Sequence, residues 1–123
     1  MAAQKDKLVL ICTHGPEDPE LATIPFVLAT AAQASDVDVL MGFQANGVLL
    51  IQQGIAEHVF APGFPPLKEL LDLYVEGGGQ LYACSPCVGS RHLSAEEFVP
   101  GAKVVSAATF VKEFTEATNV VVY

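Results

Sequence analysis

The alternation of short apolar segments with helix-like segments is the feature that most constrains the fold of this chain. Residues 8–12 are continuously apolar and are stopped by His14-Gly15-Pro16, which is typical of a strand buried on both faces of a parallel sheet. Residues 67–76 instead place their apolar side chains at helical spacing and are followed by a run of glycines. Strands that alternate with helices in this way indicate a layered α/β architecture.

The same alternation of strand-like and helix-like segments extends along the whole chain. It predicts strands over residues 7–13, 36–43, 80–83, 103–105 and 119–123, and helices over residues 20–34, 46–53, 67–76 and 107–117. The spacing of Ser94 and Glu97 predicts a capping box at the start of a short helical turn. We therefore expect one domain over residues 1–123, with a single-domain layered α/β fold and a mostly parallel five-stranded sheet flanked by helices.

Charge and hydropathy limit the classes of partner. The chain has 14 acidic and 6 basic residues, a net charge of −8, and no cluster of Lys or Arg, so direct nucleic-acid binding is not expected. No apolar run approaches the roughly 20 residues of a membrane-spanning helix. Hydrophobic residues nevertheless make up 51% of this small chain, which favours burial between subunits and predicts a homo-oligomer.

Cysteine usage indicates the compartment. Three cysteines cannot complete a disulfide framework, and residues 1–7 carry charges where a signal peptide would have its apolar region. Both observations predict a protein of the reducing cytoplasm.

The segment Cys84-Ser85-Pro86-Cys87 carries the clearest chemical signal. It follows a predicted strand and precedes a segment that can begin a helix, with Ser85 suited to the N-cap and Pro86 to the first helical position. Free amides at the start of a helix favour negative charge, so we expect a lowered pKa for Cys84 and a nucleophilic thiolate. Cys87 either resolves an oxidised Cys84 or packs the first helical turn.

Other candidate residues stand near predicted strand ends. Ligand and catalytic groups of parallel sheets collect beyond the carboxyl ends of the strands, and Cys12 and His14 lie at such an end. If the first strand adjoined the cysteine strand, these residues would share a crevice with Cys84. Without that adjacency, Cys12 is a core residue and His14 is a solvated loop residue. Arg91 is either a partner for an anionic sulfur species or a charged helix end that faces water.

Cofactor and metal sites are not expected. Cys84 and Cys87 have no second sequence-local ligand pair of the kind that structural zinc sites use. The glycines at 77–79 precede a strand, whereas a phosphate-binding loop follows one, so they are interpreted as a helix stop.

Three segments together carry a resemblance to known proteins: residues 81–93, Ile24-Pro25-Phe26-Val27-Leu28-Ala29, and the segment that begins Asn46-Gly47-Val48. With these segments, nearly the whole chain resembles the DsrE/DsrF-like family. It implies small α/β subunits that assemble into trimers, hexamers or mixed complexes, with protein sulfur donors and acceptors as partners. Cys84 matches the cysteine that carries sulfur as a persulfide in relay members of that family. Those members commonly have Arg-Gly shortly after the cysteine, where this chain has Arg91-His92.

Three functions remain open from the sequence. The first is sulfur relay through a Cys84 persulfide, which would make the protein sulfurtransferase-like if it is catalytic. The second is a dithiol redox protein, peroxiredoxin- or thioredoxin-like, because the two thiols have thioredoxin-like spacing. The third is a non-catalytic oligomeric scaffold or small-ligand binding subunit whose cysteines only pack.

Overall fold

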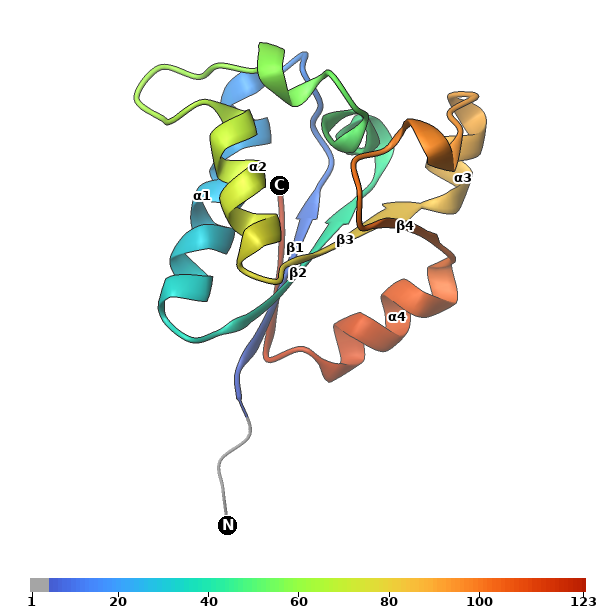
Figure 1. The fold of residues 1–123 in the computed structure, drawn as a ribbon. Helices are drawn as coiled ribbons and strands as arrows, with labels where there is room; N and C mark the ends of the chain where they lie inside the picture. The colour runs from blue at the N-terminus through green and yellow to red at the C-terminus, as the bar shows by residue number, and fades with distance from the viewer. Residues whose placement is uncertain (1–4) are drawn as a thin grey trace.

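The structure is a computed structural model that describes residues 5–123; the first four residues of the charged N-terminal segment lie outside them. A five-stranded, entirely parallel sheet has the order β4-β3-β2-β1-β5 (Figure 1). The strands are β1 (Lys7–Cys12), β2 (Asp38–Phe43), β3 (Gln80–Cys84), β4 (Ala102–Val105) and β5 (Asn119–Val122). The helices are α1 (Pro19–Ala34), α2 (Leu67–Glu76), α3 (Ser85–Ser90) and α4 (Ala107–Glu116), with short 3-10 turns η1 (Ala45–Ile51), η2 (Ala56–His58) and η3 (Ala95–Glu97).

The predicted fold class is confirmed, and the element boundaries agree closely. The helix predicted over residues 67–76 is α2, and its four apolar residues at helical spacing are buried: Leu67, Leu70, Leu71 and Tyr74. The capping box of Ser94 and Glu97 is present in η3. The short helix predicted over residues 46–53 is a 3-10 helix, η1, and it ends two residues earlier than predicted.

The two faces of the sheet are covered unequally. Helices α1 and α2 lie on one face and enclose the larger core, whereas α4 alone lies on the other face (Figure 1). Phe110 of α4 packs there with Val9, Ile11 and Leu40. Gly42 of β2 makes room for it, because a Cβ at that position would lie 2.6 Å from the Phe110 ring.

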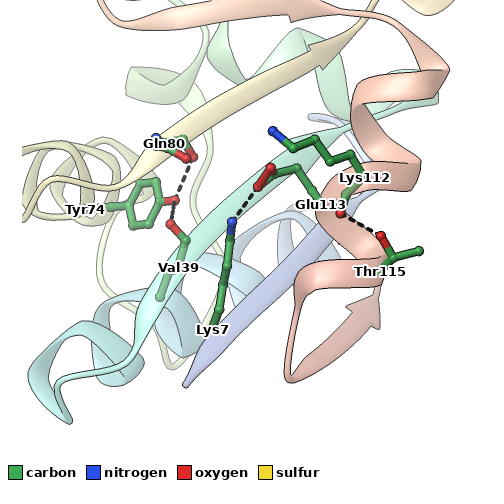
Figure 2. A network of polar contacts seen from close by, with 7 residues as sticks. All are labelled: Lys7, Val39, Tyr74, Gln80, Lys112, Glu113 and Thr115. Atoms are coloured by element: carbon green, nitrogen blue, oxygen red, sulfur yellow. Dashed lines mark hydrogen bonds and ion pairs between the residues drawn. The ribbon is translucent and has the colours of Figure 1, made fainter. Parts of the chain in front are cut away.

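Polar contacts hold both helical layers at the amino ends of the strands. Lys7 of β1 pairs with the nearly buried Glu113 of α4, and the Tyr74 hydroxyl of α2 donates to the Gln80 carbonyl at 2.7 Å (Figure 2). Burial raises the pKa of the Tyr74 phenol, so it stays protonated and able to donate. At the opposite ends of the strands, η1 contacts α3.

Within residues 5–123, no helix combines the length and the apolar character needed to cross a lipid bilayer.

Candidate functional site

Two thiols are in contact at the carboxyl end of β3. Cys84 is the last residue of this strand, and Cys87 lies in the first turn of α3. Their Sγ atoms are 2.7 Å apart, both cysteines are half-buried, and neither is in a disulfide. The spacing of two residues between them produces this contact, because the strand ends at Cys84 and the helix begins immediately after it.

The helix begins one residue earlier than the sequence predicted. Cys84 occupies the N-cap position, Ser85 is the first helical residue and Pro86 the second, so the N-cap assignment of Ser85 was wrong. Pro86 is still well placed, since the first-turn amide that it lacks has no partner inside a helix. The helix is only six residues long.

The expected lowering of the Cys84 pKa was also wrong. Burial is the main cause that raises this pKa, and the neighbouring Cys87 side chain raises it further. The Cys87 backbone amide and the Arg91 guanidinium favour the thiolate but do not outweigh these effects. Sequence patterns report a helix start but not how much water the strand end retains.

A backbone amide from another strand connection reaches the second thiol. Ala45 N–H donates to Cys87 Sγ at 3.2 Å. Ala45 follows the carboxyl end of β2, which lies beside β3 in the sheet, so η1 begins next to α3. Ala45 has a φ of +50°, a left-handed conformation that non-glycine residues seldom adopt.

Arg91 joins the same two segments. Its Nε and Nη2 donate to Asn46 Oδ1 at 3.2 and 2.9 Å, and its Nη1 donates to the Cys87 carbonyl at 3.2 Å. The guanidinium thus links η1 to the residue that carries the second thiol. Most donors of Arg91 are used within the protein, and its role toward an anionic sulfur species stays a prediction.

Cys12 is not brought to the thiol pair. It ends β1, which is separated from β3 by β2, a displacement of about 10 Å across the sheet. The register aligns Cys12 with Phe43 and Phe43 with Ala83, so the Cys12 side chain lies on the face covered by α1 and α2. Cys84 lies one position further along and faces the α4 layer.

His14 lies in the loop after β1, half-buried, with its Nδ1 3.3 Å from Thr13 Oγ1. The side-chain hydrogen bonds among residues 5–123 include none between His14 and either thiol. The same loop still contributes to the site, because Gly15 packs tightly against the Asn46 carbonyl oxygen; a Cβ there would lie 2.4 Å from it.

Ala45 and Asn46 were missed as site residues. An alanine that acts through its backbone leaves no signal in the sequence. Asn46 did leave a signal in the sequence, since a polar residue just beyond a predicted strand of a parallel sheet lies at the edge where ligand-binding groups collect. In the part of the chain from residue 5 onward, no group of three or more His, Cys, Asp or Glu side chains is placed to hold a metal ion.

Comparison with known proteins identifies the family. The model of the DsrE/DsrF-like family matches residues 6–123. The uncharacterized protein MK0008 of Methanopyrus kandleri is 26% identical over 118 residues, which cover 96% of this chain and 94% of that protein. Two solved structures share the fold: the ychN protein from E. coli has a TM-score of 0.80 at 17% identity, covering 96% of this chain and 99% of its own. Protein MTH1491 of unknown function from Methanobacterium thermoautotrophicum has a TM-score of 0.72 at 16% identity, covering 97% and 100%. The chain belongs to the DsrE/DsrF-like family.

Proposed function

We propose that this protein carries sulfane sulfur as a persulfide on Cys84 within a sulfur relay. Membership of the DsrE/DsrF-like family supports a sulfur-relay-related role at the family level. The observation that carries the finer proposal is the position of Cys84, half-exposed at the carboxyl end of a central strand and beside a second thiol. A reducing cytoplasm would keep both thiols free for this chemistry.

The transfer requires only thiol chemistry. The Cys84 thiolate attacks the outer sulfur of a donor persulfide, the S–S bond of the donor breaks, and the donor leaves as a thiolate. The new Cys84–S–SH then gives its outer sulfur to the thiolate of an acceptor protein by the same reaction. The positive charge of Arg91 favours the thiolate that begins each cycle, because it lowers the pKa of Cys84 against the effect of burial.

We also propose that the protein assembles into a homo-oligomer, either a trimer or a hexamer. Valines on the sparsely covered side of the sheet are exposed: Val111 at 57%, Val120 at 39% and Val122 at 63%. Contact between subunits would remove this apolar surface from water. Native mass spectrometry of the purified protein tests it, and a monomer at micromolar concentration would contradict it.

A dithiol redox protein is the second candidate. The Sγ atoms of Cys84 and Cys87 are 2.7 Å apart, so a disulfide needs little movement of either side chain. Its formation would release two electrons and two protons to an external thiol-oxidising partner such as a disulfide.

One experiment separates these candidates. The reduced protein is incubated with a sulfane-sulfur donor, and intact mass and peptide masses are compared with those of Cys84→Ser and Cys87→Ser. Relay predicts the addition of one sulfur atom, lost in Cys84→Ser and retained in Cys87→Ser. A disulfide without added sulfur would favour the redox function, and neither product would favour a non-catalytic subunit.

A further inference from the structure

The register of the sheet places a lysine on the same face as Cys84. Gly42 of β2 lies against Phe110 of α4 and pairs with Tyr82 of β3, which in turn pairs with Lys103 of β4. Paired residues of neighbouring parallel strands point to the same face of a sheet, so all three paired positions face the α4 side. Cys84 lies two residues after Tyr82 and shares this face. We call Tyr82, Cys84 and Lys103 the β3–β4 surface.

The β3–β4 surface is open, because α4 contacts the sheet mainly at β1. The residues of β1 and β2 that face α4 are buried: Val9, Ile11 and Leu40. On the β3–β4 surface, Tyr82 and Cys84 are half-buried and Lys103 is exposed. A ligand can therefore reach Cys84 by lying across Tyr82 and Lys103.

Lys103 is a cation whose charge is available to such a ligand. The ion pairs among residues 5–123 involve Lys5, Lys7 and Lys68, and not Lys103. Arg91 also lies near the thiols, but its guanidinium is bound to the Asn46 side chain and to a backbone carbonyl of α3. In a chain with a net charge of −8, an unpaired lysine beside a half-exposed thiol favours an anionic reactant over a neutral one.

The spacing of this surface indicates where the negative charge of the reactant lies. Two residues along a strand and one strand spacing separate Cys84 from Lys103, a distance between Cα atoms of about 8 Å. When Cys84 attacks a persulfide, two sulfur–sulfur bonds of about 2 Å each separate its Sγ from the carbon chain of the donor. A carboxylate a few bonds further along the donor then falls within reach of the flexible Lys103 side chain. The half-buried Tyr82 provides an apolar contact for the carbon chain between them.

We propose that Lys103 is a specificity-determining residue that binds the carboxylate of a low-molecular-weight persulfide while Cys84 takes its outer sulfur. This inference rests on the proposed function and names the class of its sulfur donor. The Cys84 thiolate attacks the outer sulfur, the S–S bond of the donor breaks, and the electron pair of that bond leaves with the inner sulfur as a carboxylate-bearing thiolate. One sulfur atom is transferred, and no further oxidant or reductant is needed.

The proposed oligomer leaves this surface accessible. Lys103 belongs to β4, at one edge of the sheet, whereas the exposed Val120 and Val122 belong to β5 at the other edge. Contact between subunits through these valines therefore does not require Lys103 or Cys84 to be covered.

Alkylation with a charged and a neutral reagent tests the role of Lys103 without any sulfur donor. In the Cys87→Ser background, the labelling rate of Cys84 is measured with iodoacetate, which carries a carboxylate, and with iodoacetamide, which does not. The ratio of the two rates cancels any change in the ionisation or exposure of Cys84. We expect Lys103→Gln to lower the ratio of iodoacetate to iodoacetamide rates about threefold, the effect of one charge at about 6 Å in water.

Two further variants and a change of salt serve as controls. Lys103→Arg keeps the positive charge and should keep the ratio, and Lys68→Gln removes the same charge from α2, on the other face of the sheet, and should also keep it. In about 1 M salt the effect of Lys103→Gln should disappear, because screening is then strong over a few ångströms. An unchanged ratio in Lys103→Gln, or an equal loss in Lys68→Gln, would overturn the proposal.

Sulfur loading extends the test to the reaction itself. The persulfides of 3-mercaptopropionate and 2-mercaptoethanol differ in that only the first carries a carboxylate, and the mass gain on Cys84 is followed with each. We expect the wild-type protein to load faster from the first, and Lys103→Gln to lose about threefold of that preference.

The two experiments separate this inference from the proposed function. A protein that prefers iodoacetate through Lys103 but takes sulfur from neither persulfide contradicts the proposed function alone. A protein that loads sulfur on Cys84 with the same preference in wild type and Lys103→Gln contradicts only the role of Lys103.

Discussion

Cys12 and Cys84 each end a strand of the same parallel sheet, yet their surroundings differ completely. Cys12 is 1% exposed and lies beneath α1 and α2, whereas Cys84 is half-buried at the carboxyl end of β3, beside a second thiol. The register places Cys12 level with Ala83, one residue before Cys84. Since side chains of a strand alternate between faces, this offset of one residue decides which thiol is available for chemistry.

The largest expected difference between the two is in reactivity. Iodoacetamide at neutral pH should label Cys84 and Cys87 at least about a thousandfold faster than Cys12, because Cys12 becomes accessible only when the protein opens. Peptide mapping by mass spectrometry measures the rates. In urea the three rates should converge, and comparable rates in the native protein would show that α1 and α2 do not seal the strand end.

Adding a methyl group beside each strand end compares how tightly the two ends are packed. Gly47→Ala would place a Cβ 1.9 Å from the Cys12 carbonyl oxygen, and we expect it to lower the free energy of unfolding by about 3 kcal/mol. A Cβ added at Gly89 of α3 would meet no neighbouring atom within 4 Å, so Gly89→Ala is the matched control. We expect that control to change stability by less than about 1 kcal/mol.

Urea unfolding of both variants provides the measurement. Equal losses would mean that the end of β3 is as closely packed as the end of β1.

The smallest effect that we expect is a dependence of stability on pH. Burial raises the pKa of the Cys12 thiol far above its usual range, so the native protein keeps a proton that the unfolded chain loses above about pH 8.5. The contribution of Cys12 to stability is complete below that pH and declines as the pH rises, by about 2 kcal/mol between about pH 8.5 and about pH 10.

Cys12→Ala should remove this part of the pH dependence, which urea unfolding under reducing conditions measures at both pH values. Cys84→Ala is the control: the pKa of Cys84 is raised in the same direction, but its exposure to water reduces the effect. An identical slope in wild type and Cys12→Ala would contradict the explanation.

The sequence was most informative where structure is local. The limits of α2, the strand at residues 7–12 and the capping box of Ser94 follow from side-chain periodicity and short-range capping, which depend on neighbours along the chain. The close packing of Gly47 on the Cys12 carbonyl could not be predicted, because it is a contact between segments that are distant in the sequence. The prediction of a lowered Cys84 pKa was wrong because burial of the thiol at the strand end depends on which distant segments pack around it.

The sequence by itself determined the alternating elements, the α/β class, and a pair of thiols at the junction of a strand and a helix. The tertiary structure decided which of the three thiols meet, and brought the Ala45 amide and the Asn46–Arg91 pair to Cys87. Periodicity along the chain encodes which residues are buried in each element, but strand order and register arise from the packing of all the elements together. The placement of β2 between β1 and β3 therefore separates Cys12 from the thiols of Cys84 and Cys87. The segment that follows β2 reaches Cys87.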